Sequence, residues 1–415
     1  MKIAMLMSVF GEHAIGGAER SAEKSARELA RQGHQVSLLS LSAAGITTPQ
    51  SLHVDGLTHV PIPLAQLYDP YRLDGQKHRL AVTHSSLAKG LWHAIDVYNP
   101  IMGGRLEGLW QRDRPDLVIT HTLQGFSVAA WRAARRCGAA LVHVIHDYAL
   151  MCPGTAMTRG TVSCDRPCTR CDIYGRARRL ASPMPNAVIA PSRAVLERHQ
   201  QSGWFVGVAD QRVIENSRAP DWPLVTQPRP STAVRPLRFG FLGRLDESKG
   251  LDTLLQAACR LPSEQYEVRV AGPGDQAWVR AFIEAQGLTP NIRLDGVVQA
   301  ADFLNEIDVL VTPSRACETF CNVVMEAACL GIPAIVSDRG ALLERVDSGV
   351  SGWIFPAGDE QALAQLMQLC LDDREDVAER GAAALQTRSR YDPERQVEAW
   401  ASVCAEVLAR HRASP

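Results

Sequence analysis

The chain repeats one pattern along most of its length: a short, mostly apolar run rich in β-branched residues is followed by a segment with helical periodicity. In the opening fifty residues the apolar run Lys2–Phe10 leads through a glycine-containing loop into a helix. A second apolar run, Gln35–Ser40, follows that helix. Two parallel strands need a crossover helix of this kind between them. The pattern therefore predicts parallel sheets covered by helices, which is an α/β fold.

The first half of the chain continues in the same way. Its further strand-like runs are Asp116–His121, Ala140–His146 and Asn186–Ser192. The last of them ends at Ser192, which is a suitable N-cap for the helix that follows. We expect this half to form one doubly wound, Rossmann-like sheet.

The pattern restarts after a proline-rich stretch, residues 220–231, whose composition is typical of an exposed linker. The strand-like runs of the second half are 237–242, 266–271, 309–312 and 334–337. A length of 415 residues suits two domains. We expect an N-terminal domain at 1–218, a linker at 219–234, a C-terminal domain at 235–392 and a final helical segment at 393–415.

Composition excludes several classes of protein. The 44 basic and 45 acidic residues give a net charge of -1, so no general attraction to nucleic acid is expected. No apolar run reaches the length of a spanning helix, and we interpret the apolar N-terminus as a buried strand rather than a signal peptide. We therefore expect a cytoplasmic protein that is at most peripheral to a membrane.

The segment Ser314–Ala327 is the most informative part of the sequence. It follows a strand and opens a helix, and the unpaired amides of a helix start favour a phosphate group. If the whole segment were helical, Glu318 and Glu326 would stand about 12 Å apart. Because carboxylates repel a diphosphate, we assign Glu318 to hydroxyls of a sugar and Glu326 to those of a ribose. The donor-binding residues expected at the helix start itself are Phe320, Cys321 and Asn322.

The cations that a diphosphate needs are supplied by the loop Gly243–Gly250, which also lies between a strand and a helix. Arg244 can hold phosphate oxygens with a fork of donors, and Lys249 can act as a compact charge. Taken alone, the two side chains could equally be ordinary surface charges. The neighbouring glutamate segment favours the functional interpretation.

These motifs, together with Gly331–Gly340, resemble the large retaining glycosyltransferase family 4, over nearly the whole chain and most weakly between residues 41 and 112. The resemblance implies the GT-B architecture, in which two Rossmann-like domains face each other across a cleft and the C-terminal helix crosses back to the first domain. It also implies a nucleotide-diphosphate sugar donor, UDP- or GDP-linked, and front-face transfer of a hexose with retention. The acceptor would be a glycan or a lipid-linked molecule of surface polysaccharide or glycolipid biosynthesis, reached at the inner face of the membrane. No cofactor would be required for catalysis.

The resemblance also assigns residues. The catalytic set that it implies is His146, Arg244, Lys249 and Glu318. The glycine loop that contains Gly16 and Gly17 would face the donor and the acceptor. The alternative for His146 is a hydrogen-bonded histidine at a strand end, and we interpret His121, at the neighbouring strand end, as structural. One departure from the family pattern, Gly340-Ala341 in place of paired glycines, leaves these assignments standing.

A cysteine cluster is the unusual feature of this sequence: Cys152, Cys164, Cys168 and Cys171. Four thiolates could close a structural zinc site, and the last two have the tight two-residue spacing of many such sites. Four reduced thiols in a polar loop are the alternative, because the first spacing is loose.

A basic patch follows the cluster, at Arg170, Arg176, Arg178 and Arg179. Beside apolar residues it could meet an anionic lipid or a membrane surface, although a solvated charged face is the simpler interpretation.

Three other classes of protein are compatible with parts of this pattern. A dinucleotide oxidoreductase lacks support, because the first loop does not carry the Gly-x-Gly-x-x-Gly fingerprint. A nucleotide-sugar 2-epimerase would use the same fold and the same donor without an acceptor. A non-catalytic nucleotide-sugar-binding subunit would also share the fold.

Overall fold

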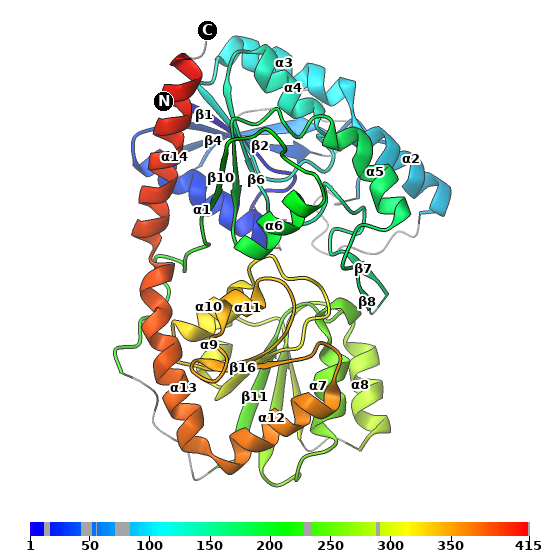
Figure 1. The fold of residues 1–415 in the computed structure, drawn as a ribbon, viewed down its shortest axis with the longest axis vertical. Helices are drawn as coiled ribbons and strands as arrows, with labels where there is room; N and C mark the ends of the chain where they lie inside the picture. The colour runs from blue at the N-terminus through cyan, green and yellow to red at the C-terminus, as the bar shows by residue number, and fades with distance from the viewer. Residues whose placement is uncertain are drawn as a thin grey trace. The chain divides into compact units, whose positions relative to one another are not determined.

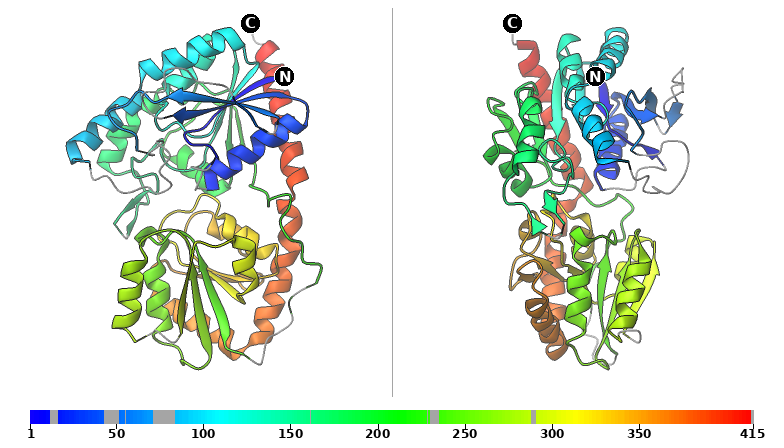
Figure 2. Two further views of the ribbon diagram at one scale, coloured as in Figure 1. Left: turned by 180° about the vertical axis from the view of Figure 1, so that it is seen from behind. Right: turned by 90° about the vertical axis from the view of Figure 1, so that its right-hand side faces the viewer.

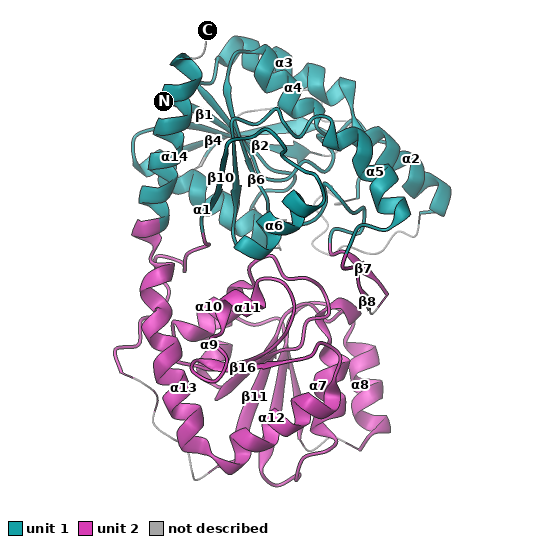
Figure 3. Cartoon of the chain, viewed as in Figure 1, with its two compact units in different colours: residues 1–155, 166–214, 396–415 teal, residues 156–165, 215–395 magenta. Residues whose placement is uncertain are grey.

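The structure, a computed structural model, describes residues 1–11, 17–42, 52–54, 56–70, 84–160, 162–227, 229, 235–287 and 291–413. The chain divides into two compact units (Figures 1 and 3). Unit 1 contains Met1–Thr155, Arg166–Ile214 and Gln396–Pro415, and unit 2 contains Ala156–Asp165 and Glu215–Arg395. The boundary after the first unit thus lies at 214, and the short segment 156–165 is grouped with the second unit.

Unit 1 is built on one sheet in the order β10-β9-β6-β5-β1-β2-β4-β3, and only β3 is antiparallel to its neighbour. Its strands are β1 (Lys2–Leu6), β2 (Gln35–Ser42), β3 (Leu52–Val54), β4 (Leu57–Pro63), β5 (Leu117–Thr120), β6 (Ala140–Val144), β9 (Ala187–Ala190) and β10 (Asp210–Val213). Its helices are α1 (Gly17–Arg31), α2 (Ser86–Val97), α3 (Pro100–Asp113), α4 (Ala129–Arg136), α5 (Thr169–Arg179), α6 (Arg193–Gln201) and most of α14 (Pro393–Ala413). The strand order reverses between β1 and β5, so ligands are expected outside the carboxyl ends of these strands.

Helices cover both faces of this sheet (Figure 2). On one face, Ala26 of α1 and Trp400 of α14 share a buried apolar cluster with strand residues such as Ile119. The end of the chain is therefore part of the core of unit 1. Each strand is buried along its apolar run, which is why β5, β6 and β9 are continuous rather than alternating in hydrophobicity.

Unit 2 is built on a six-stranded parallel sheet in the order β13-β12-β11-β14-β15-β16. Its strands are β11 (Leu237–Leu242), β12 (Tyr266–Ala271), β13 (Ile292–Gly296), β14 (Val309–Thr312), β15 (Ala334–Ser337) and β16 (Gly352–Phe355), and a small hairpin, β7 (Thr158–Arg159) and β8 (Val162–Ser163), is grouped with it. Its helices are α7 (Leu251–Ala258), α8 (Gln276–Ala285), α9 (Ala300–Asn305), α10 (Asn322–Ala328), α11 (Leu342–Arg345), α12 (Glu360–Asp372) and α13 (Arg374–Gln386). Here the order reverses between β11 and β14.

Two apolar clusters pack against the sheet of unit 2. One joins it to α7, α8 and α12, and the other joins it to α9, α10 and α11. Two doubly wound sheets of this form confirm the predicted fold class.

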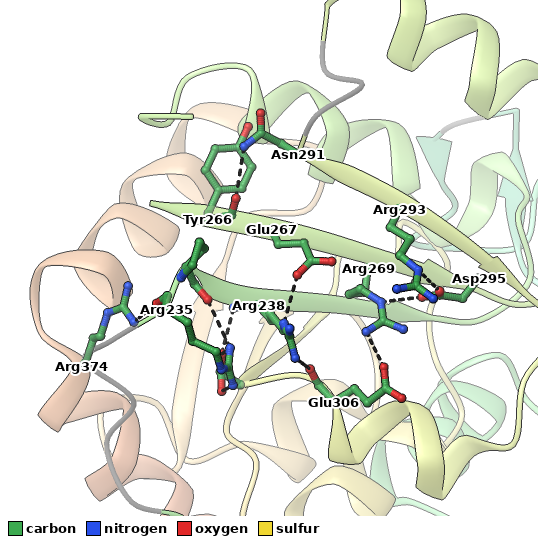
Figure 4. A network of polar contacts seen from close by, with 12 residues as sticks. Arg235, Arg238, Tyr266, Glu267, Arg269, Asn291, Arg293, Asp295, Glu306 and Arg374 are labelled. Carbon is green, nitrogen blue, oxygen red and sulfur yellow. Dashed lines mark hydrogen bonds and ion pairs between the residues drawn. The ribbon is translucent and has the colours of Figure 1, made fainter. Parts of the chain in front are cut away.

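An ion-pair network along β12 was not anticipated from the sequence (Figure 4). The guanidinium of Arg269, which is 5% exposed, lies 2.7 Å from Asp295 and 2.5 Å from Glu306. Arg238 pairs with Glu267 at 3.0 Å on the adjacent strands. β12 therefore carries a buried arginine whose charge is neutralised by acidic side chains of neighbouring elements.

The expected elements agree with the structure with small differences at their ends. β1 ends at Leu6, four residues before the apolar run does. The expected helix from Gly250 begins at Leu251, because Gly250 has a left-handed φ of 67° and separates a 3₁₀ turn, Glu247–Lys249, from α7. The hairpin β7–β8 and the helices α2 and α3 were not foreseen.

Candidate active site

The site in unit 2 lies at the switch point of its sheet. The loop after β11 and the loop after β14 are joined by backbone hydrogen bonds: the carbonyl oxygen of Ser248 accepts from the amides of Arg315 (2.8 Å) and Ala316 (3.0 Å). A Cβ at Gly250 would overlap the carbonyl oxygen of Pro313. Glycine is therefore required for the two loops to approach this closely.

This approach brings the two key charges together. Lys249 Nζ lies 2.7 Å from Glu318 Oε1, and the hydroxyl of Ser314 donates to the same carboxylate oxygen. Both side chains are mostly buried, with 26% of the lysine and 11% of the glutamate exposed. The sequence placed these two residues in one donor site, and the fold pairs them directly.

The pair keeps both groups ionised. Burial by itself would lower the pKa of Lys249, but the carboxylate of Glu318 outweighs it and the pKa is raised. Burial by itself would raise the pKa of Glu318, but Lys249, the Ser314 hydroxyl and Arg244 together lower it. At neutral pH the site therefore holds a fixed cation beside a fixed carboxylate.

Arg244 differs from Lys249 in exposure. Its side chain is 62% exposed and lies 3.4 Å from Asp246, a weak surface pair. The Asp246 carboxylate also accepts from the amide of Ser248 (3.0 Å) and so shapes the turn that carries Lys249. Arg244 is thus accessible to a ligand, whereas Lys249 is fixed.

The glutamate segment is only partly helical. α10 begins at Asn322, and Cys321 before it has a left-handed φ of 68°. Glu318 therefore lies in the loop and Glu326 on the helix, so the separation of about 12 Å expected for a continuous helix does not apply. A non-glycine residue in this conformation marks a strained turn.

The remaining residues of the segment have different roles. The side chain of Phe320 is buried, under the guanidinium of Arg345 at 4.4 Å, so a donor could meet only its backbone. The amide oxygen of Asn322 accepts from Asn216 at 3.0 Å. Glu326 is half-buried on α10.

A third loop, after β15, completes this edge of the sheet. The amide of Ala341 donates to the carbonyl oxygen of Glu318 at 2.8 Å. Gly340 has a φ of 57°, and a Cβ there would overlap that same carbonyl. Gly340 is thus the position that needs glycine, and the buried Ala341 beside it is compatible with the site.

In unit 1 the candidate residues follow the strands nearest the switch point. Gly17 is the first residue of α1, and Gly16 lies outside the described residues. His146 follows β6 and His121 follows β5, and the two imidazoles form a hydrogen bond of 2.8 Å between Nδ1 of His121 and Nε2 of His146. Their rings are stacked, with centroids 5.1 Å apart.

Both imidazoles are neutral at pH 7. Burial lowers the pKa of His146 to about 4 and lowers that of His121 well below its usual value. Within the described part of the chain, no group hydrogen-bonds the buried Nε2 of His121. A proton there would be costly, which favours the tautomer in which Nδ1 of His121 donates to Nε2 of His146.

One predicted surface feature needs correction, and one buried arginine was not predicted. Arg178 does not belong to the exposed basic patch: its guanidinium is 3% exposed and pairs with the buried Asp96 at 2.7 Å. The buried Arg345 pairs with Glu215 at 2.6 Å and was not found from the sequence. An isolated Arg in an amphipathic helix gives no signal of such a role.

None of the eleven cysteines, all of which lie in the described ranges, is part of a disulfide. Burial, together with the neighbouring thiols of Cys152 and Cys168, raises the pKa of Cys171 to about 12. In the described ranges no group of three His, Cys, Asp or Glu side chains already has the geometry of a metal site.

Comparison with known proteins agrees with this geometry. Residues 16–217 match a family model described as a glycosyl transferase 4-like domain, and residues 236–373 match one described as glycosyl transferases group 1. The chain therefore belongs to the group 1 glycosyltransferases, in agreement with the resemblance found in its motifs, and is a glycosyltransferase.

Among its relatives, an uncharacterised 42.6 kDa protein in the cps region of Klebsiella pneumoniae is 24% identical over 83% of this chain and 87% of its own length. The amylovoran biosynthesis glycosyltransferase AmsK of Erwinia amylovora is 29% identical over 42% of this chain and 45% of that protein.

Solved structures share the fold. A sucrose-phosphate synthase from Thermosynechococcus elongatus has a TM-score of 0.77 at 17% identity and covers 99% of this chain and all of that one. Anabaena Alr3699/HepE in complex with UDP has a TM-score of 0.71 at 19% identity, over 98% of this chain and all of that one. These likenesses establish the GT-B fold.

Proposed function

We propose that this glycosyltransferase transfers a hexose, with retention of configuration, from a UDP- or GDP-sugar to a glycan or a lipid-linked acceptor of surface polysaccharide or glycolipid biosynthesis. The observation that carries the proposal is the Lys249–Glu318 pair at the switch point of unit 2. Switch points are where open α/β sheets bind nucleotides. The likeness to Alr3699/HepE, solved with UDP, and the relative named for amylovoran biosynthesis support the same class of donor and pathway.

The side chains of unit 2 provide the parts that leaving-group stabilisation needs. Lys249 is a buried, permanently ionised cation, and the exposed Arg244 can close on a diphosphate as a second. Glu318 holds Lys249 in place and has a second carboxylate oxygen for a sugar hydroxyl. Glu326, on α10, would bind the ribose.

His146 is assigned to the reacting sugar. With a pKa of about 4 it is neutral under working conditions and serves as a hydrogen-bonding group rather than a cation. Catalysis would then rest on positioning and on charge stabilisation of the departing diphosphate, whose oxygen would take the acceptor proton. The anomeric configuration of the product tests this step, because inversion contradicts it.

A thermal-shift screen of UDP, GDP and TDP tests the donor site. We expect one nucleotide to stabilise the wild type and to lose that effect in Lys249→Met and Glu326→Ala. Arg260→Ala is the matched control and should behave as the wild type, because Arg260 is an exposed arginine just after α7 that pairs with Glu360. No stabilisation by any nucleotide would contradict the proposal.

The test also separates the alternatives. A 2-epimerase would isomerise UDP-N-acetylglucosamine without an acceptor, and a binding subunit would bind a nucleotide sugar without turnover. Release of free nucleotide that depends on an added acceptor extract is expected only for the transferase.

None of the described helices is long and apolar enough to cross a membrane. We propose instead that unit 1 meets an anionic membrane surface through α2 and α5. Leu87 and Leu91 on α2 are 75% and 50% exposed, and Ile173 on α5 and Leu180 at its C-cap are 68% and 83% exposed. Arg176, between the last two on one helix face, adds the positive charge such a surface favours.

Flotation with vesicles tests this contact. We expect binding to vesicles that contain phosphatidylglycerol, weaker binding to pure phosphatidylcholine, and a loss of binding in the double variant Leu87→Asp, Ile173→Asp. Arg280→Glu, on α8 of unit 2, serves as the charge control. Equal binding of the wild type and all variants to these vesicles would refute the proposed membrane contact.

A further inference from the structure

Arg345 is a buried cation that the proposed transfer does not use. It is the last residue of α11, and its side chain is 0% exposed. α11 begins two residues after Gly340, whose backbone packs on the carbonyl oxygen of Glu318. Arg345 therefore lies about one helical turn beyond the loop that supports the donor-site carboxylate. Arg345 and all of the partners named below it in this network belong to unit 2.

The guanidinium of Arg345 is held by a carboxylate and by two aromatic side chains. Its Nη2 donates to Glu215 at 2.6 Å, and its Nη1 donates to the hydroxyl of Tyr391 at 3.4 Å. Its Cζ lies 4.4 Å from the centroid of the Phe320 ring. The rings of Phe320 and Tyr391 are perpendicular, with centroids 6.3 Å apart. A guanidinium over a ring and away from water forms a strong cation–π contact.

The anchors of Arg345 lie outside the donor loop. Glu215 is the first residue of the long segment of unit 2, and it also pairs with Arg390 at 2.9 Å. Near the other end of that segment, the carbonyl oxygen of Tyr391 accepts from the amide of Arg218 at 3.0 Å. Arg345 therefore connects the donor loop to both ends of the segment.

Phe320 occupies a sensitive position in the donor loop. It lies two residues after Glu318 and directly before Cys321, whose φ of 68° is strained for a residue with a side chain. On the other side of Cys321, the side-chain amide of Asn216 donates to Asn322 at 3.0 Å. The strained turn is thus held by one contact on each side, and the position of Glu318 relative to α10 depends on both.

Stability alone gives no reason for an arginine at this position. A buried ion pair is often no more stabilising than apolar residues of the same volume, because both charged groups lose their hydration. Within the described part of the chain, the Nε of Arg345 also has no hydrogen-bond partner, which is a further cost. The feature that an apolar side chain could not supply is a planar cation against the ring of Phe320.

We propose that Arg345 is a positioning residue for the donor site. By fixing the ring of Phe320 it holds the turn that follows, and that turn sets where Glu318 lies against Lys249. The fully buried side chain of Arg345 does not itself contact the nucleotide or the sugar. The role rests on the proposed donor site: it raises affinity by keeping the loop in its binding conformation before the ligand arrives.

Titration of the full chain with UDP and with GDP tests this role. Arg345→Lys keeps a charge beside Glu215, but an ammonium group has no planar face to lie on the ring of Phe320. We expect the dissociation constant of the preferred nucleotide to rise about 10-fold in this variant.

Arg380→Lys is the matched control. Arg380 also lies over a ring, with its Cζ 4.6 Å from the centroid of Trp353, and it pairs with Asp376 at 2.7 Å. Its guanidinium donates to the carbonyl oxygen of Gly352, the first residue of β16, and so lies at the amino end of that strand. Because the donor loops follow the carboxyl ends of the strands, Arg380→Lys should bind the nucleotide as the wild type does.

A second measurement needs no nucleotide. If Arg345 sets the position of Glu318, the pair of Glu318 with Lys249 is weaker in Arg345→Lys. Adding Lys249→Met should then lower Tm by about half as much in that background as in the wild type, whereas independent sites would give equal losses. A wild type that binds no nucleotide would contradict the proposed function, but this comparison would still decide whether Arg345 positions Glu318.

Three results would overturn the proposal. The first is an unchanged nucleotide affinity in Arg345→Lys, and the second is an equal loss of Tm from Lys249→Met in both backgrounds. The third is an equal loss of affinity in Arg380→Lys, because a general loosening of unit 2 would then explain both variants. If Arg345→Lys does not fold, Phe320→Leu, which removes the ring under the guanidinium, replaces it with the same expected results.

Discussion

Replacing Lys249 by methionine keeps most of the length of the side chain and removes its charge. Glu318, 11% exposed, then loses its direct cationic partner and keeps the Ser314 hydroxyl and the field of Arg244. At 2.7 Å and an effective dielectric constant of about 20, the gross attraction lost is about 6 kcal/mol. Most of this is offset by the desolvation of the two groups, so we expect a net loss of about 2 kcal/mol in the free energy of unfolding. For a unit of this size that lowers Tm by about 4–8 °C.

The pH dependence identifies the cause. The folded-state pKa of Glu318 is lowered from 4.5, so its contribution to stability is present above that value and is lost as the pH falls through the folded pKa. The pKa of Lys249 is raised from 10.5, so its contribution is present below that value and is lost as the pH rises further. The difference in Tm between wild type and Lys249→Met should therefore be largest between pH 4.5 and pH 10.5, and it should become smaller as the pH falls below 4.5.

Calorimetric unfolding and nucleotide titration together separate stability from function. Lys249→Met should raise the dissociation constant of the preferred nucleoside diphosphate about 10- to 150-fold, which is the effect of losing one charge-assisted hydrogen bond. The double variant Lys249→Met, Glu318→Gln buries no unpaired charge, so it should regain most of the stability but none of the affinity. A double variant less stable than Lys249→Met, or a Tm difference that does not change from pH 7 to pH 4, would refute the reasoning.

Three shorter predictions follow. His121→Leu removes the hydrogen bond to His146 and should lower kcat about 10-fold at unchanged KM. His121→Asn can still donate a hydrogen bond from the Nδ1 position and should retain much of the wild-type kcat. Equal losses of kcat in both variants would contradict a positioning role. Arg178→Leu leaves the Asp96 carboxylate buried without its partner and should destabilise unit 1 by about 3–5 kcal/mol in denaturant unfolding, an effect that Asp96→Asn in the same chain should reduce. Gly250→Ala should abolish nucleotide-induced stabilisation, because its Cβ would push the loop after β11 off the loop after β14; a variant that binds nucleotide normally would show that the loops separate without cost.

Local pattern was enough to find most of the strands. Runs such as Leu117–Thr120 and Ala334–Ser337 are buried on both faces, and a buried parallel strand is continuously apolar in the sequence. The ion pairs of Arg269 were not predicted, because its partners lie 26 and 37 positions away in the sequence, outside any local window.

The candidate site, like the fold, could be predicted from the sequence only in part. The residue types in Gly243–Gly250 and around Glu318 indicated a diphosphate site, because the chemistry needs cations and amides next to strand ends. The helix expected in the second half of that segment begins at Asn322. The left-handed turn at Cys321, which ends the loop before it, was not predicted, because sequence gives no reliable sign of such a turn.

The sequence by itself determined the class of fold, the division into two halves and the identity of the residues that could hold a nucleotide sugar, because each depends on side-chain chemistry and on local periodicity. Tertiary structure alone decided which of them meet: Lys249 with Glu318, and His121 with His146. These pairs join residues far apart in the chain, and their distances depend on strand order and on close backbone approach at a few glycines. Periodicity along the chain contains no information on either.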